Sequence, residues 1–124
     1  MLRVNSNINS DFKKKYSYEE RVDESTRALI KHPCRRPVIC EKIKYQNDLP
    51  NIDNIKYLVP YDITIGQFIF FIRNRIQIKP QEAIFLFINN KIISGSTMMG
   101  RIYESAKDND GFLYVQYAKE NTFG

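Results

Sequence analysis

The sequence predicts one α+β domain, in which a helical N-terminal unit precedes a sheet that one long helix crosses. Three observations predict this fold class: the length of 124 residues, a capped helical pattern near the N-terminus, and apolar runs of strand length on both sides of an amphipathic helix. This length suffices for one compact domain and not for two. With 43% hydrophobic and 27% charged residues, the composition is that of a folded protein.

The N-terminal unit is predicted to be helical from residue 11 onward, after a flexible polar arm over residues 1–10. A short helical segment covers residues 11–16. Ser17 and Glu20 then form a capping box at the start of a longer helix. That helix is expected to end at His32-Pro33, because a residue before proline disfavours the α conformation.

The middle of the chain predicts two strands and the crossing helix. The strands fall at residues 38–40 and 56–59, with a loop or wide hairpin between them. Thr64 and Gln67 form a second capping box, which opens a strongly amphipathic helix. Its apolar stripe recurs at helical spacing and consists of Ile65, Phe68, Ile69, Ile72 and Ile76.

The C-terminal part predicts a hairpin, a short helix and a last strand. Asn89-Asn90 supplies the tight turn between strands at 83–88 and 91–93, because Asn tolerates a positive φ. Thr97 is expected to cap the short helix, and the last strand covers residues 112–117. A strand this densely apolar is typical of the middle of a sheet.

This order of elements is the β-grasp arrangement of ubiquitin, with an additional N-terminal helical unit. The domain is expected to cover residues 11–118 and to be followed by a polar C-terminal tail over residues 119–124. The sequence contains no internal repeat.

The net charge of +5 is concentrated near the N-terminus. Residues 1–44 carry eleven Lys and Arg against six Asp and Glu, whereas residues 45–124 carry eight of each. A local basic excess of this kind favours acidic peptides, anionic lipid headgroups or nucleic acid as partners, although a basic face that is merely solvated is an equal alternative.

Several function classes find no support in the sequence. Cys34 and Cys40 form no disulfide framework and, with His32 as the only histidine, no metal site, so two free thiols are expected. No stretch approaches the roughly 20 apolar residues that span a bilayer. No catalytic triad or phosphate-binding loop is visible, and we expect neither enzyme activity nor a cofactor.

An RNA-binding domain is the alternative that the aromatic strands suggest. The strand over residues 111–117 resembles the aromatic strand of RNA-recognition motifs, and residues 86–89 resemble its companion. However, Leu113 stands where that motif keeps the sheet face open with Gly or Ala. Only seven residues follow Tyr117, too few for the helix and strand that such a domain requires next. We therefore expect no nucleic-acid partner.

Several motifs together resemble the autophagy ubiquitin-like modifiers, the relatives of the microtubule-associated light chains and of the GABA-receptor-associated protein. The resemblance starts near residue 12 and continues to the aromatic-Gly pair at residues 123–124. The segments that carry it include Tyr57-Leu58-Val59-Pro60, Asp62 to Phe68, Ile72-Arg73-Asn74-Arg75-Ile76, Phe87-Ile88-Asn89-Asn90 and Phe112-Leu113-Tyr114-Val115.

The resemblance implies a role for the C-terminal residue. Gly124 would be activated by one enzyme, passed on as a thioester by a conjugating enzyme, and linked to phosphatidylethanolamine. A glycine suits this chemistry because it has no Cβ and can enter narrow active sites. The protein would be a cytoplasmic monomer that joins a membrane after lipidation. That membrane would be the autophagosome or, as in some parasite relatives, a plastid.

The resemblance also implies that an edge strand captures short peptides of the form aromatic-x-x-aliphatic by adding them to the sheet. Two pockets would hold the peptide side chains, and basic residues would attract its acidic flanks. The first pocket is expected from Glu24, Ala28, Pro37, Ile39, Lys56, Leu58 and Phe112. The second is expected from Tyr57, Val59, Pro60, Ile63, Phe68 and Phe71, and the attracting cations are Arg35, Lys56 and Arg75. Ala28 replaces a larger aliphatic residue of the family and is expected to widen the first pocket.

Overall fold

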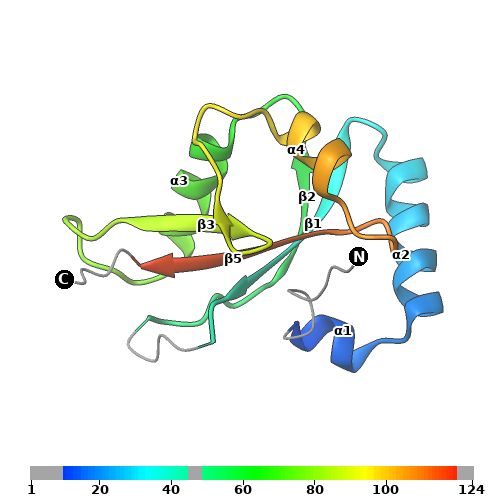
Figure 1. Ribbon diagram of the computed structural model, residues 1–124, viewed down its shortest axis with the longest axis horizontal. Coiled ribbons are helices and arrows are strands. Elements are labelled where there is room, and N and C mark those ends of the chain that lie inside the picture. Colours follow the sequence, from blue (N-terminus) through cyan, green and yellow to red (C-terminus); the bar gives the residue numbers. More distant parts are fainter. Residues whose placement is uncertain (1–9, 45–48, 120–124) are drawn as a thin grey trace.

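The structure is a computed structural model, which describes residues 10–44 and 49–119. Its mixed sheet and helices confirm the predicted ubiquitin-like α+β class (Figure 1). The elements are, in chain order, α1 (Asp11–Lys15), α2 (Tyr18–Lys31), β1 (Arg35–Lys42), β2 (Lys56–Pro60), α3 (Ile65–Arg75), β3 (Ile84–Ile88), β4 (Lys91–Ile92), α4 (Met99–Ala106) and β5 (Leu113–Lys119).

The strands form one sheet in the order β2-β1-β5-β3-β4. β5 runs parallel to β1, while the pairs β1–β2, β3–β5 and β3–β4 are antiparallel. The prediction that the last strand lies inside the sheet is therefore confirmed. β2 is one edge of the sheet, and β4, with only two residues, is the other.

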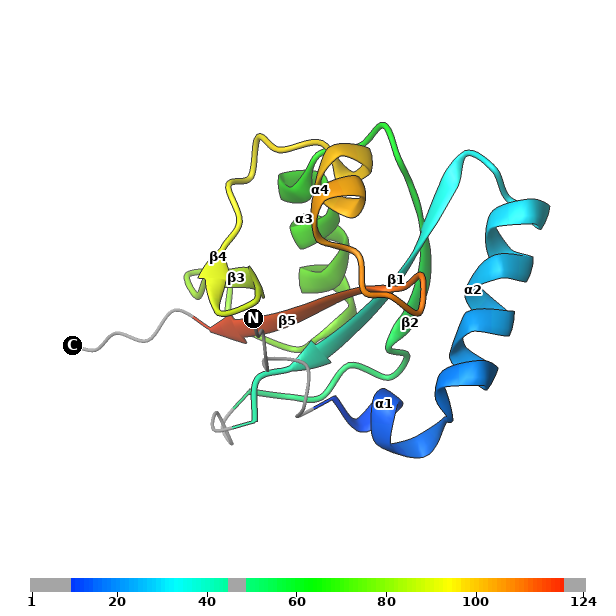
Figure 2. The same ribbon diagram turned by 45° about the vertical axis from the view of Figure 1, so that its right-hand side comes forward.

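Helices cover both faces of the sheet (Figure 2). Val38 and Cys40 of β1 point into the main core, which they share with Phe68 and Ile72 of α3. Ile39, between them, points to the opposite face and belongs to a second cluster with Phe12 of α1. The alternation of side chains along a strand thus places the N-terminal helices on the face opposite α3.

Both predicted capping boxes are confirmed. The Ser17 hydroxyl accepts from the Glu20 N–H (3.1 Å), and the Glu20 carboxylate accepts from the Ser17 N–H (2.8 Å). Thr64 and Gln67 make the same reciprocal pair at the start of α3. These bonds satisfy backbone N–H groups that a helix N-terminus leaves without partners.

The prediction that Thr97 caps α4 is wrong. The N-cap is Met98, whose side chain makes no capping hydrogen bond. A neighbouring segment supplies the acceptors instead: the Met99 N–H donates to the Ile63 carbonyl (2.8 Å) and the Gly100 N–H to the Tyr61 carbonyl (2.9 Å). The start of this helix is fixed by tertiary contacts, which a local sequence pattern does not reveal.

The tight turn at Asn89-Asn90 is confirmed, with φ values of 52° and 68°. A third positive φ, 92°, occurs at Gly111 in the turn before β5. Within the described residues, no helix has the length and apolar character needed to cross a bilayer.

Candidate functional site

The candidate site is built around β2, which lies at the edge of the sheet and pairs with β1 in the described part of the chain. An edge strand presents backbone N–H and C=O groups on which a further strand can assemble. Side chains alternate across it: Lys56 and Leu58 share one face, and Tyr57 and Val59 share the other. The predicted edge position of this segment is therefore present in the structure.

On the α2 side of β2, the structure brings together most of the residues expected in the first pocket. The Lys56 ammonium and the Glu24 carboxylate form an ion pair of 2.5 Å between β2 and α2. Beneath them, Pro37, Ile39 and Phe112 are buried. Leu58 and Ala28 are half-buried at this side. The ion pair therefore lies at the surface of this apolar group and joins β2 to α2.

On the α3 side, an aromatic cluster occupies the place of the second pocket. The Tyr57 ring makes edge contacts with Phe68 (6.1 Å between centroids) and Phe71 (5.6 Å), and the Arg75 guanidinium lies over Phe71 (5.5 Å). Phe68 is 1% exposed and Val59 is 3% exposed, whereas Phe71 is 41% exposed. Of the residues expected here, Phe68 and Val59 therefore belong to the core, and Phe71 is accessible at the surface. Pro60 and Ile63, also expected here, are half-buried.

Burial and charge act on Tyr57 in opposite directions. Burial raises the pKa of its phenol to about 12, while the positive charge of Arg75 opposes that shift. The hydroxyl is buried and makes no hydrogen bond of good geometry in the described part of the protein. The Arg75 guanidinium lies near it, 6.0 Å from the centroid of the Tyr57 ring. The phenol thus stays neutral at physiological pH.

The expected cations lie around the edge strand, but each is already engaged. Arg35 donates to the Leu58 carbonyl (3.0 Å), and Arg75 pairs with Asp53 (3.2 Å). Lys56 holds Glu24, as described above. Acidic residues of a peptide would therefore compete with existing partners at each of these positions.

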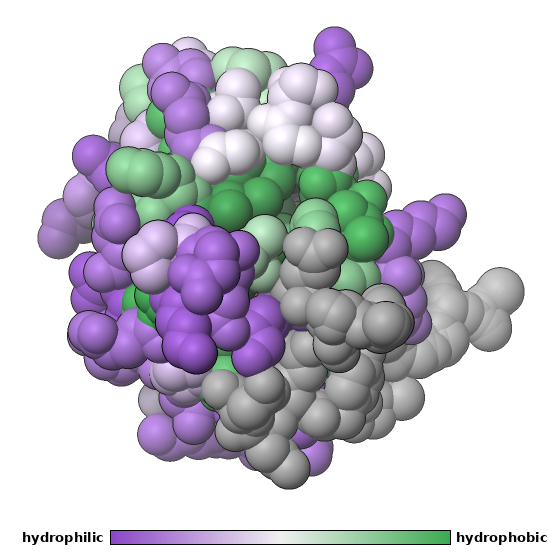
Figure 3. All heavy atoms as spheres, turned by 90° about the vertical axis from the view of Figure 1, so that its left-hand side faces the viewer, coloured by the Kyte–Doolittle hydropathy of each residue, from purple (hydrophilic) through white to green (hydrophobic). Residues whose placement is uncertain are grey.

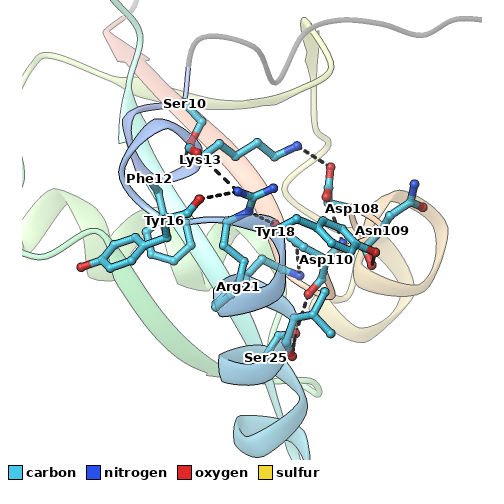
Figure 4. Close-up of polar contacts among 12 residues, drawn as sticks. Ser10, Phe12, Lys13, Tyr16, Tyr18, Arg21, Ser25, Asp108, Asn109 and Asp110 are labelled. Carbon is cyan, nitrogen blue, oxygen red and sulfur yellow. Dashed lines mark hydrogen bonds and ion pairs between the residues drawn. The ribbon is translucent and has the colours of Figure 1, made fainter.

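A buried polar network joins α2 to the turn before β5 (Figure 4). The Asp110 carboxylate accepts from Arg21 Nε (2.8 Å), the Tyr114 hydroxyl (2.5 Å) and the Phe112 N–H (2.9 Å). Its backbone carbonyl accepts from the Ser25 hydroxyl (2.5 Å). Because the Asp110 side chain is fully buried, the three donors to its carboxylate offset the loss of water around the charge.

The same network reaches α1. Arg21 also donates to the Tyr16 carbonyl (2.6 Å) and the Lys13 carbonyl (3.3 Å), while the Lys13 ammonium pairs with Asp108 (2.7 Å). Burial acts to raise the pKa of Asp108, but hydrogen bonds from Lys13 and from the Asp110 N–H lower it overall. Sequence reasoning missed this network, since its members lie about 90 positions apart.

The two cysteines are free, as the sequence predicts. Cys40 is buried in the core, and burial raises the pKa of its thiol above the ordinary value, which keeps it protonated. Cys34 is exposed beside the edge strand.

The aromatic residues of the last strand are not open to nucleic acid. Phe112 and Tyr114 are buried, and the Phe12 ring of α1 packs on them at 5.2 Å and 6.4 Å between centroids. RNA-recognition domains need such rings exposed on the sheet for base stacking. The geometry therefore opposes the RNA-binding alternative.

Apolar surface also occurs away from β2. Figure 3 shows green apolar patches among polar residues on the side that lies at the left of Figure 1. Among the exposed apolar side chains are Phe70 of α3 and Ile92 of β4. The assignment of the site at β2 therefore depends on the free strand edge and not on apolar exposure alone.

The fold and the site define a ubiquitin-like β-grasp protein with two added N-terminal helices and a free edge strand. The family model described as "Autophagy protein Atg8 ubiquitin like" matches residues 20–124. The chain belongs to this Atg8 family, which confirms the resemblance seen in the sequence.

Individual relatives support the same assignment. Autophagy-related protein 8 of Mycosarcoma maydis is 50% identical over 94% of this chain and 98% of its own length. The protein of the same name from Saccharomyces cerevisiae is 49% identical over 94% and 99%. Among solved structures, Trypanosoma brucei ATG8 superposes with a TM-score of 0.87 at 40% identity, covering 94% of this chain and 99% of that one.

Proposed function

We propose that this protein is a non-enzymatic modifier that is linked through Gly124 to phosphatidylethanolamine and that recruits proteins carrying aromatic-x-x-aliphatic motifs to the membrane. The observation that supports the proposal is the edge position of β2 in the sheet, with one apolar core cluster on each face of the sheet beside it. Membership of the Atg8 family supports it.

The peptide would add to the sheet as a strand beside β2. Its backbone would pair with the outward N–H and C=O groups, while its aromatic and aliphatic side chains would enter the sites on the α2 and α3 sides. Burying each side chain contributes roughly 1.5–3 kcal/mol. Two such anchors together contribute roughly 3–6 kcal/mol, to which backbone pairing and charge attraction from the basic residues around the edge would add.

The variant Lys56→Glu tests this site. The change places a second carboxylate beside Glu24, where the flanks of the peptide are acidic, and removes the cation of the edge strand. Titration calorimetry with an acidic motif peptide is expected to show affinity at least about tenfold lower, equal to about 1.4 kcal/mol. Lys91→Glu, an exposed lysine on the other edge, is the matched control and should leave affinity unchanged. Equal affinity of Lys56→Glu and the wild-type protein would contradict peptide binding at β2.

Conjugation through the chain end is tested separately. Gly124 lies outside the described residues, so its role rests on the family assignment and on the chemistry of a residue without Cβ. Two acyl chains, each contributing ~0.8 kcal/mol per buried CH₂, would hold the protein stably on a bilayer.

Gly124→Ala is expected to abolish the lipid-dependent shift on a gel in cells where the conjugating enzymes are active. Gly95→Ala, in an exposed loop, is the control and should still shift. The amide spectra of both variants should match that of the wild-type protein. Persistence of the lipidated band in Gly124→Ala would refute the proposed linkage.

The names of the relatives favour autophagic membranes as the destination. They describe autophagy-related proteins from fungi, and the solved neighbour is a trypanosome ATG8. We propose a cytoplasmic monomer that reaches autophagosomes after conjugation, with activating and conjugating enzymes as further partners. A fluorescent copy, compared with its Gly124→Ala variant, would show whether puncta coincide with autophagosomes or with a plastid.

A further inference from the structure

We propose that the carboxamide of Asn54 closes the free edge of β2, so that a peptide has to displace this side chain before it can pair with the strand. The inference rests on the proposed capture of peptides at β2 and concerns the control of that same site. It assigns a specificity-determining role to a residue outside both apolar pockets.

The ladder between β1 and β2 shows which backbone groups reach the free edge. The Cys40 N–H donates to the Ile55 carbonyl (2.8 Å), which marks a hydrogen-bonded pair at one end of the ladder. Such pairs alternate with non-hydrogen-bonded pairs along antiparallel strands. The next pair, Lys56 opposite Ile39, is therefore not hydrogen-bonded, and neither is the pair that contains Leu58. The N–H and C=O groups of Lys56 and Leu58 consequently point away from β1, toward any added strand.

Asn54 occupies both outward groups of Lys56. Its Oδ1 accepts from the Lys56 N–H (3.2 Å), and its Nδ2 donates to the Lys56 carbonyl (3.1 Å). A side-chain carboxamide has the same donor and acceptor as a peptide unit. Asn54 therefore makes the two bonds that a neighbouring strand would make at this residue.

The adjacent outward acceptor is occupied as well. Arg35 Nη1 donates to the Leu58 carbonyl (3.0 Å). Two consecutive positions of the edge are thus covered by side chains of the same protein. Covering an edge in this way is a known means of preventing unwanted strand pairing.

Contacts on both sides hold Asn54 in place. Asp53, the preceding residue, accepts from Arg75 Nη2 of α3 at 3.2 Å and 3.3 Å. Lys56, on the other side, is tied to Glu24 of α2. The segment that presents the carboxamide is therefore attached to the helices that border the two pockets.

Binding would exchange these internal bonds for bonds to the peptide backbone. The free energy that a peptide gains at Lys56 is only the difference between its own hydrogen bonds and those it displaces from Asn54. Peptides whose backbone pairs weakly with β2 are therefore bound less well. Peptides that can offer both an N–H and a C=O at this position are favoured. A peptide with N-methylation there cannot replace the bond from Asn54 to the carbonyl.

Calorimetry on Asn54→Ala tests the competition, using a synthetic peptide in which acidic residues precede Trp-Ser-Ser-Leu. The variant removes the competing bonds, so its affinity is expected to be about three- to tenfold higher than that of the wild-type protein. Asn54→Ser, which retains a weaker acceptor, should lie between the two. Asn51→Ala, an exposed residue in the same segment, is the matched control and should bind like the wild type.

Hydrogen exchange in the free protein tests the internal bond without any peptide. The Lys56 amide should exchange about three- to tenfold faster in Asn54→Ala, while amides of the core strands keep their protection. Unchanged exchange at Lys56 overturns the proposal, and so does faster exchange with equal or lower peptide affinity. If neither the wild-type protein nor Asn54→Ala binds the peptide, the proposed capture of peptides at β2 is contradicted together with the role of Asn54. If the two proteins bind it equally well, only the role of Asn54 is contradicted.

Discussion

Single residues show how little freedom the turn before β5 has. Gly111 has a φ of 92°, a value that L-residues rarely adopt, and a Cβ at this position would overlap the Ser25 hydroxyl. That hydroxyl in turn donates to the Asp110 carbonyl. The turn and α2 therefore fit together only with glycine at this position.

Gly111→Ala is expected to lower the free energy of unfolding by roughly 2–4 kcal/mol, because the backbone strain and the overlap with Ser25 add together. Urea denaturation followed by circular dichroism measures this change. Gly95→Ala is the control, since a Cβ there comes no closer than 3.7 Å to other atoms and the φ needs no glycine. A loss below about 0.5 kcal/mol for Gly111→Ala would show that the turn can adapt.

At the scale of elements, the N-terminal helices depend on one buried charge. Asp110 joins α2 to the turn before β5 through Arg21, and it accepts two further bonds from Tyr114 and Phe112. By contrast, the pair between Asp23 and Arg27 on α2 is exposed and connects neighbours on the same helix. These two Asp–Arg pairs have similar chemistry and very different environments.

Asp110→Ala is expected to destabilise the protein by about 3–5 kcal/mol, because it leaves Arg21 buried without its counter-charge. Asp23→Ala, the matched control, is expected to cost at most about 0.5 kcal/mol. Thermal and urea unfolding measure both. Similar losses of unfolding free energy in the two variants would mean that burial does not determine how much an Asp–Arg pair stabilises the protein. Exchange protection of the α2 amides would show whether the helix detaches before the sheet unfolds.

At the scale of the whole molecule, charge should govern how fast peptides arrive. Arg35, Lys56 and Arg75 surround the edge strand, and attraction between exposed charges weakens as salt shortens the Debye length. The association rate of an acidic motif peptide is expected to fall roughly tenfold from low to high salt. Stopped-flow fluorescence measures it, with a peptide of uncharged flanks as the control. Equal salt dependence of both peptides would contradict electrostatic attraction at this edge.

The structural elements that the sequence predicts are those that are determined by residues close to one another along the chain. Ser17 with Glu20, and Thr64 with Gln67, determine helix starts within four residues, and Asn89-Asn90 determines its own turn. The start of α4 could not be read in this way, because its acceptors come from Tyr61 and Ile63, well over thirty positions upstream of the helix.

Only part of the candidate site could be predicted from the sequence, again because some of its contacts are local and others are not. Its apolar residues belong to recognisable strands and helices, but the bonds that cover its edge depend on register. Asn54 lies two residues from its partner, yet its relevance appears only when the pairing of β1 with β2 shows which groups of Lys56 face outward. The link from Arg21 to Asp110 spans 89 positions and has no local signature at all.

The central position of β5 has a mechanical consequence. This strand ends at Lys119, near the C-terminus of the chain. It is hydrogen-bonded to β1 on one side and to β3 on the other. Tension applied at the carboxyl end would load both ladders in shear, so that many hydrogen bonds resist together instead of peeling apart one at a time.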